Sequence, residues 1–148
     1  MNERNIDTDS ARENSALLMK VGLRVTNQRL RVIALFRHTD LRHLSGDQVH
    51  TMLRAQKVDI SLPTVYRVLS QLSEVGILAR QMFRSGISTF ELQTEAHHDH
   101  LVCLGCGRVD EFHDEGLDAR KRSAAEACGY ALTSDAITLY GYCQACRR

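Results

Sequence analysis

"SLPTVYRVLSQLSEVGIL", residues 61–78, predicts a helix with one apolar and one polar face, and the expected fold of the first half is built around it. Pro63, the only proline in the chain, comes soon after Ser61, at a position that the first turn of a helix tolerates. Gly76 is expected to end the helix. The residues expected on its buried face recur at helical spacing: Val65, Val68, Leu69 and Leu72.

The segments on either side of this helix complete a winged-helix pattern, which is a helix-turn-helix followed by a β-hairpin. Upstream, a short amphipathic helix is expected over 10–19, a second over 27–39 after a threonine cap, and a third after the cap residue Ser45. Downstream, 77–83 and 88–92 are typical of two strands around a turn that contains glycine. The last three helices and the hairpin therefore predict a winged helix.

The charge of the chain is divided unevenly between its two halves. The 148 residues, 43% of them hydrophobic, suffice for one domain or two small ones, and the net charge is only +1. Residues 15–90 hold 11 Lys and Arg against 4 Asp and Glu, a net of +7, whereas 96–148 hold 6 against 8, a net of −2. A polyanion is the natural partner of such a basic half, although a merely solvated surface would also look basic.

The polar face of the helix over 63–75 carries side chains suited to DNA. Helix-turn-helix proteins place one helix in the major groove, where residues near its N-terminus reach base edges. Thr64, Tyr66 and Arg67 lie on this face; an arginine can pair with guanine or phosphate, and an aromatic ring can pack on a thymine methyl. Arg24, in the loop before the second helix, can reach the backbone or an adjacent groove. The alternative is an ordinary solvated face, but the wing and the charge favour DNA.

Four of the five cysteines form two matched pairs. Cys103-x-x-Cys106 is followed, after 36 intervening residues, by Cys143-x-x-Cys146. Two such knuckles complete a closed tetrahedral zinc site, which would staple the end of the chain to the earlier knuckle and play a structural role. A redox pair and two chance near-repeats are the alternatives. Cys128 has no partner in the pattern and is expected to be a buried, small apolar residue at a helix end.

The run "HHDH", residues 97–100, is expected to serve two sites from one strand. Successive side chains of a strand point to opposite faces, so His98 and His100 share one face while His97 and Asp99 share the other. Histidines and carboxylates without sulfur suit Fe(II), Mn(II), Co(II) or Zn(II). The alternative to a metal site is that these histidines are ordinary polar residues of the surface.

His98 and His100 need further ligands to hold an ion. Glu91, at the end of the wing, and Glu111 are close enough in sequence to supply carboxylates. His43, far upstream, can contribute only through the fold.

The second half is expected to form a small α+β unit after a polar hinge, 93–96. A hairpin is expected over 100–112, turning at glycines, and a helix over 116–128. A further strand is expected within 136–142.

Taken together, these motifs resemble the ferric uptake regulator family of metal-dependent bacterial transcription factors. The resemblance covers roughly residues 15–146. It depends on "GLRVTNQRLRVI", "RHLSGDQVH", "TVYRVL", "FEL", "HHDHLVCLGCGRVDEF" and "LYGYCQAC". It implies an α+β fold in which a winged-helix DNA-binding domain (1–92) is hinged (93–96) to a small α+β dimerisation domain (97–148), forming a two-fold dimer.

The resemblance also implies three metal sites. The structural zinc would be held by Cys103, Cys106, Cys143 and Cys146. The hinge site would consist of His43, Glu91, His98, His100 and Glu111. The second site, in the dimerisation domain, would consist of His97, Asp99 and Asp118, with Asp135 where the family commonly supplies a histidine. That carboxylate would make the second site more anionic and less selective.

The branches of the family sense iron, zinc, manganese, nickel or peroxide. Peroxide sensors typically have an aspartate in place of Glu111, and zinc sensors often have a cysteine near the position of Glu91. Both observations favour an iron-type regulator. We therefore predict a repressor of iron-uptake genes that uses Fe(II), for which Mn(II), Co(II) or Zn(II) can substitute, and that binds a palindromic, A/T-rich operator.

Two other interpretations remain at this point. The first is a zinc- or peroxide-sensing regulator on the same scaffold. The second is a zinc-dependent hydrolase with Glu91 or Glu111 as general base, which is disfavoured because no HExxH-type motif occurs. The polar start of the chain and the lack of a long apolar run predict a cytoplasmic protein without membrane contact. Whether its dimers pair further on DNA is left open.

Overall fold

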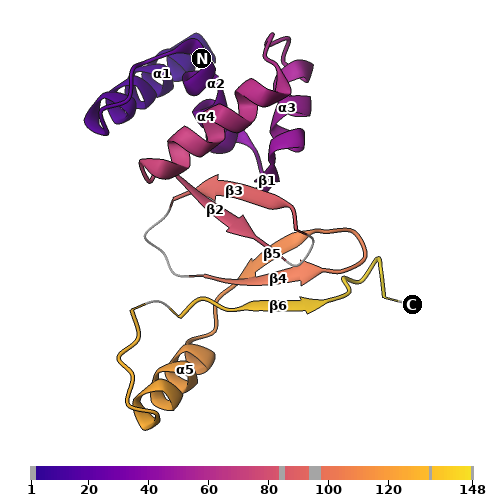
Figure 1. The fold of residues 1–148 in the computed structure, drawn as a ribbon. Helices are drawn as coiled ribbons and strands as arrows, with labels where there is room; N and C mark the ends of the chain where they lie inside the picture. The colour runs from indigo at the N-terminus through magenta and orange to yellow at the C-terminus, as the bar shows by residue number, and fades with distance from the viewer. Residues whose placement is uncertain (1–2, 84–85, 94–97, 134, 148) are drawn as a thin grey trace. The chain divides into compact units, whose positions relative to one another are not determined.

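The computed structural model describes residues 3–83, 86–93, 98–133 and 135–147 (Figure 1). The chain divides into two compact units, Met1–Gln93 and Thr94–Arg148. Most of the predicted hinge lies outside the described residues, so the hinge stays a prediction.

The N-terminal unit contains four helices: α1 (Glu3–Lys20), α2 (Asn27–His38), α3 (Gly46–Ala55) and α4 (Leu62–Glu74). All four helices predicted for this half are present. The difference is at α1, which begins seven residues before the predicted start at residue 10. Apart from Ile6 its first turns are polar, and one apolar residue gives no apolar repeat from which a helix could be predicted.

Side-chain caps determine where the three later helices begin. The Thr26 hydroxyl accepts a hydrogen bond from the Arg29 N–H, and Ser61 accepts one from the Thr64 N–H. Ser45 and Gln48 form a capping box, in which each side chain binds the backbone N–H of the other residue. Because these bonds satisfy amide groups that the helices leave unpaired, the caps fix the starts of α2, α3 and α4.

A small antiparallel sheet completes this unit, with the order β1-β3-β2. The wing hairpin consists of β2 (Leu78–Met82) and β3 (Ser88–Leu92), as predicted. The sequence does not predict the strand β1 (Leu44–Ser45), because two residues are too few to show an alternating pattern. The pairing of β1 with β3 brings the chain just before α3 to the wing.

The hydrophobic core of this unit lies among its helices and one face of its sheet. The predicted apolar stripe of α4 is buried: Val65, Val68, Leu69 and Leu72. It packs with Val32 and Ile33 of α2 and with Leu53 of α3 in one cluster. This packing exposes the opposite face of α4, which carries the residues expected to meet DNA.

The C-terminal unit is a three-stranded sheet with one helix, in the order β5-β4-β6. It contains β4 (Asp99–Cys103), β5 (Val109–Phe112), α5 (Glu115–Ala127) and β6 (Thr138–Gly141). β4 and β5 form the expected antiparallel hairpin, whereas β6 runs parallel to β4. Within this unit α5 lies at the end of the sheet where β4 and β6 begin (Figure 1).

The mixture of helices and sheets confirms the predicted α+β class. No helix in the described part of the chain is both long and apolar enough to cross a membrane.

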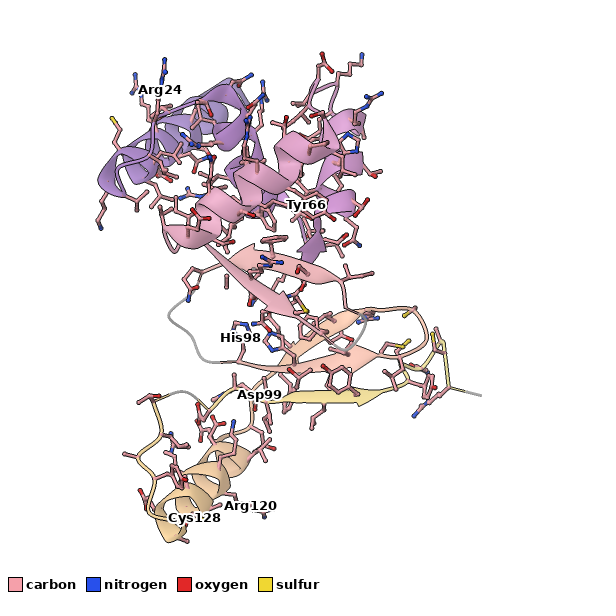
Figure 2. All side chains as sticks on the ribbon, viewed as in Figure 1. Arg24, Tyr66, His98, Asp99, Arg120 and Cys128 are labelled. Carbon is pink, nitrogen blue, oxygen red and sulfur yellow. The ribbon has the colours of Figure 1, made fainter. Side chains whose placement is uncertain are left out.

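The prediction for Cys128 is wrong, because the residue is exposed rather than buried (Figure 2). Cys128 is the C-terminal cap of α5, and its backbone N–H binds the carbonyl groups of the last helical turn. A cap residue lies at the end of its helix, so the apolar character of the side chain does not decide its burial.

Replacing a fully buried leucine of α4 is expected to destabilise the N-terminal unit. Leu69→Ala removes packed methyl groups and leaves a cavity, which should lower the free energy of unfolding by roughly 2–5 kcal/mol. Glu74→Ala, on the exposed end of the same helix, is the matched control and should change it little. Chemical denaturation of both variants measures the difference, and equal stabilities would contradict the assigned core.

Candidate metal centres and DNA-binding face

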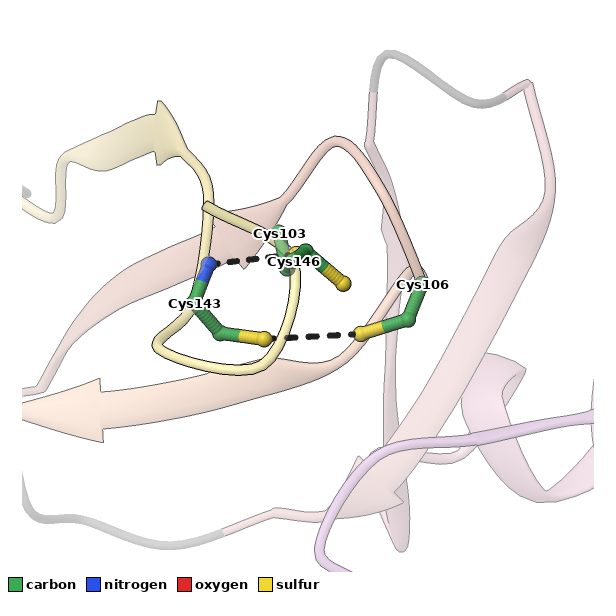
Figure 3. Close-up of side chains that lie close together, drawn as sticks. All are labelled: Cys103, Cys106, Cys143 and Cys146. Carbon is green, nitrogen blue, oxygen red and sulfur yellow. Dashed lines mark hydrogen bonds between the residues drawn. The ribbon is translucent and has the colours of Figure 1, made fainter. Parts of the chain in front are cut away.

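The four cysteines of the two knuckles converge in the C-terminal unit (Figure 3). Their four sulfurs all lie within 4.8 Å of one another, and the sulfurs of Cys106 and Cys143 are 3.9 Å apart. Tetrahedral zinc with Zn–S bonds of about 2.3 Å places its sulfurs about 3.8 Å apart, so these spacings suit zinc. The donor set therefore fits a closed four-thiolate site.

The parallel pairing of β6 with β4 explains why the knuckles meet. Cys103 pairs with Gly141 at the ends of these two strands, so each strand delivers its knuckle to the same edge of the sheet. Gly105 lies so close to the last knuckle that a Cβ atom there would be 2.9 Å from the Cys146 sulfur. Glycine is needed at this position because any side chain would displace a ligand.

Backbone amides prepare the site for negative charge. The Cys103 sulfur accepts hydrogen bonds from the N–H groups of Cys143 and Gly105, at 3.3 and 3.4 Å. The bond from Cys143 and further bonds from the knuckle lower the pKa of Cys103 to about 6. Hydrogen bonds with Cys143 and the other cysteines raise the pKa of Cys146 to about 12. One thiolate is thus favoured without metal, whereas four close thiolates need a cation.

In the N-terminal unit, His43 and Glu91 lie side by side. His43 directly precedes β1, and the pairing of Leu44 with Phe90 puts it next to Glu91 on β3. The His43 Nε2 atom is 3.7 Å from the Glu91 carboxylate, and both side chains are buried. Gln81 on β2 donates a hydrogen bond of 3.0 Å to the other carboxylate oxygen. Two ligand types that suit divalent cations are therefore held together on this unit.

In the C-terminal unit, His98, His100 and Glu111 form a second group. His100 on β4 pairs directly with Glu111 on β5. The imidazole rings of His98 and His100 are 4.9 Å apart and nearly perpendicular, and His98 Nε2 is 3.8 Å from the Glu111 carboxylate. The sequence prediction that His98 and His100 share a face is confirmed, since both lie on the side of Glu111.

The environment of His100 keeps its imidazole neutral. Burial lowers the pKa of His100, and the neighbouring His98 lowers it further, against smaller opposing effects of Glu111 and Asp99. Metals bind the neutral imidazole, so this group is in its ligand form at physiological pH.

The carboxylates expected in the second site meet around a lysine. Asp99 on β4, Asp118 on α5 and Asp135 before β6 all contact the ammonium group of Lys121. The opposite orientation of Asp99 and His100 confirms the predicted alternation of the strand. His97 lies outside the described residues. A cation therefore already lies among the carboxylates that the family resemblance assigns to a metal.

On the exposed face of α4, Tyr66 is held by residues of α3. Its hydroxyl donates a hydrogen bond of 2.7 Å to the Asp47 carboxylate. This bond, with burial and the charge of Asp47, raises the pKa of Tyr66. A Cβ on Gly46 would be 2.5 Å from the Tyr66 ring, so only glycine leaves room for the ring there. The ring edge presented by α4 is therefore fixed in place.

The other residues expected at DNA lie in the same unit. Arg67 is exposed on α4, and Arg24 is exposed in the loop before α2 (Figure 2). The Arg24 carbonyl accepts a hydrogen bond from Arg29, whose guanidinium also binds Gln71 of α4 at 3.0 Å. Thr64 is less available, because its hydroxyl is 2.8 Å from that of Ser61 in the helix cap.

Sequence reasoning does not identify three residues that shape these sites: Asp47, Gln81 and Lys121. Asp47 and Gln81 act through contacts between different elements, which no local pattern shows. For Lys121 a sequence indication exists, because it follows Asp118 by three residues in a predicted helix and so shares its face.

Known proteins resemble this chain over most of its length. Residues 20–140 match the ferric uptake regulator family. The ferric uptake regulation protein of Cupriavidus metallidurans is 46% identical over 126 residues, which cover 85% of this chain and 88% of that protein.

Two solved structures support the same relationship. The ferric uptake regulator of Vibrio cholerae is 40% identical, with a TM-score of 0.83 over 88% of this chain and 99% of its own. The ferric uptake regulator of Francisella tularensis, solved with iron, is 33% identical, with a TM-score of 0.79 over 86% and 96% of the two chains.

Removing one knuckle cysteine is expected to cost both the zinc and the fold of the C-terminal unit. Cys143→Ser should lose bound zinc, and with it a contribution on the order of 10 kcal/mol if binding and folding are coupled. The matched control is Cys128→Ser, because Cys128 is exposed and lies outside the cluster. Elemental analysis and circular dichroism measure the outcome; a folded, zinc-free Cys143→Ser protein would contradict a structural role.

Proposed function

Because this chain belongs to the ferric uptake regulator family, we propose that it is an Fe(II)-dependent repressor of iron-uptake genes. Members of this family are metal-responsive regulators of transcription rather than enzymes. The relatives named above carry ferric uptake in their names, which favours iron over the zinc- and peroxide-sensing alternatives. Binding DNA as a regulator also implies a cytoplasmic location.

The mechanism is supported by one observation, which is that each unit holds half of a suitable ligand set. His43 and Glu91 are paired in the N-terminal unit, and His98, His100 and Glu111 are grouped in the C-terminal unit. We propose that these two groups together form one regulatory site. When bound, a divalent ion supplies a fixed link between the units.

The ligands in each unit are already oriented for an ion by contacts within that unit. The neutral His100 imidazole offers a lone pair, and the buried Glu91 carboxylate is oriented by Gln81. Nitrogen and oxygen donors without sulfur accept Fe(II), Mn(II), Co(II) and Zn(II). The four cysteines would hold a separate, structural zinc that takes no part in the response.

The link matters because DNA half-sites have a fixed separation. In a dimer, the angle between the two units would set the distance between the paired α4 helices, and only one angle fits both half-sites. Metal and DNA binding would then strengthen each other, typically by about 1–3 kcal/mol. The Vibrio cholerae relative is described as showing a rearrangement of its DNA-binding domains, which is the kind of freedom that this mechanism uses.

The proposed DNA contacts lie on α4 and the loop before α2. Arg67 and the fixed ring of Tyr66 would enter the major groove with Thr64 beside them on α4, while Arg24 would contact the backbone or an adjacent groove. The partner would be a palindromic, A/T-rich operator, bound by a homodimer.

Removing a ligand of the proposed regulatory site should abolish the metal response and leave the fold intact. His98→Ala is expected to lose the metal-dependent increase in operator affinity, which for such coupling is roughly 5–150-fold. His38→Ala, an exposed histidine at the end of α2, is the matched control. Fluorescence anisotropy with labelled operator, with and without Mn(II), measures both. A normal metal response in His98→Ala would refute the assigned site.

Removing the exposed arginine of α4 should weaken DNA binding without affecting metal. Arg67→Ala is expected to cost about 1–3 kcal/mol of operator affinity, because one base or phosphate contact is lost. Arg120→Ala removes the same charge from α5 of the other unit and should have little effect. The same anisotropy titration, repeated at several salt concentrations, separates a base contact from a phosphate contact. If Arg67→Ala bound the operator with unchanged affinity, this would contradict the proposed contact between α4 and DNA.

A further inference from the structure

Lys121 of α5 lies where a metal of the second site would have to lie. Its ammonium nitrogen is 3.2 Å from both Asp99 carboxylate oxygens and 2.7 Å from an Asp118 oxygen. It also donates a hydrogen bond of 2.8 Å to the Asp135 carbonyl, and the Asp135 carboxylate is 3.9 Å away. All three aspartates expected to bind an ion therefore surround one ammonium group.

Lys121 makes both hydrogen bonds and an ion pair within this cluster. Its ammonium group donates hydrogen bonds to the Asp99 carboxylate and to the Asp135 carbonyl, and it forms an ion pair of 2.7 Å with the Asp118 carboxylate. The side chain of Lys121 is only 15% exposed, so little water competes for these bonds. The Lys121 ammonium group is therefore a largely buried cation surrounded by three aspartates, unlike a surface ion pair that is open to water.

Two of the carboxylates need such a cation because they are buried. The side chains of Asp99 and Asp118 are 2% and 6% exposed, and uncompensated charges at such positions are costly. Other groups help: the Ile137 N–H donates a 2.9 Å hydrogen bond to Asp99, and His113 lies 3.5 Å from Asp118. Lys121 is the cation that contacts all three aspartates.

The fold holds Lys121 in this position. It lies three residues after Asp118 and shares its helix face, while β4 presents Asp99 to the same place. The Asp135 that contacts it stands where the resemblance expects a histidine ligand. A neutral histidine there would add no negative charge, whereas the Asp135 carboxylate adds a third negative charge near the ammonium group and the Asp135 carbonyl accepts a hydrogen bond from it.

We infer that Lys121 is the resident cation of this cluster, so that the chain itself fills the site where the family resemblance predicts a second metal. The second site is then a permanent ion-pair network that joins α5 to the sheet. Together with the proposed function, on which this last step depends, the inference leaves one regulatory ion per chain, at the proposed hinge site.

The test counts Mn(II) ions in the zinc-loaded, full-length protein. His98→Ala serves as the background, because it disables the proposed hinge site. In this background Lys121→Gln removes the ammonium charge and keeps the side-chain length nearly unchanged, and Arg120→Gln removes an exposed charge one residue away. Equilibrium dialysis with elemental analysis gives Mn(II) per chain, and thermal unfolding with and without Mn(II) reports stabilisation.

Lys121→Gln is expected to gain one Mn(II) ion per chain and a Mn(II)-dependent rise in Tm, because three clustered carboxylates are left without their cation. Arg120→Gln should gain neither. Adding Asp118→Asn to Lys121→Gln should remove the gain. A Lys121→Gln protein that binds no more Mn(II) than its background would overturn the inference.

A second variant tests the same inference where Lys121 is intact. Asp118→Asn alone should leave the Mn(II) count of the otherwise unchanged protein as it was and should lower its Tm, since Lys121 loses its closest partner. Loss of one Mn(II) ion per chain would instead show a metal at this cluster. A failure of the proposed hinge site would give a different result. His98→Ala would then bind as many Mn(II) ions per chain as the unchanged protein, both with Lys121 and with Gln at residue 121.

Discussion

The two-residue repeat of an extended strand determines where the ligands of the C-terminal unit lie. Along β4, Asp99 turns towards Lys121 and α5, whereas His100 turns towards Glu111. At the end of the same strand, Cys103 begins the first cysteine knuckle, and the parallel pairing with β6 brings the second knuckle to it. One strand of five residues thus supplies three separate cation environments, and a shift of its register by one residue would exchange the two faces.

Each of these environments solves the same electrostatic problem, because buried carboxylates and clustered thiolates are unstable without positive charge. The four cysteines suit a tetrahedral zinc, and the proposed hinge ligands suit a divalent ion that binds reversibly according to the metal concentration. The third group, around Asp99 and Asp118, has a cation that belongs to the chain. A lysine cannot dissociate, so this group can contribute to stability but cannot report metal supply.

Local signals make much of the fold predictable from the sequence. The caps Thr26, Ser45 and Ser61 and the apolar stripe of α4 depend on neighbouring residues, and the sequence motifs identify the family correctly. Features that depend on contacts between distant segments are not predictable in this way. These are the pairing of β1 with β3, the parallel direction of β6 and the contact of Lys121 with Asp99 of β4. The prediction for Cys128 is wrong because residue type alone does not reveal which helix end is exposed.

Pulsed electron paramagnetic resonance of bound Mn(II) can show whether one ion takes ligands from both units. With zinc in place and no more than one Mn(II) ion added per chain, we expect nitrogen couplings from three imidazoles, those of His43, His98 and His100. His43→Ala should then remove one imidazole from the spectrum. An unchanged spectrum in His43→Ala would mean that the C-terminal unit holds the ion alone, which would contradict the proposed link between the units.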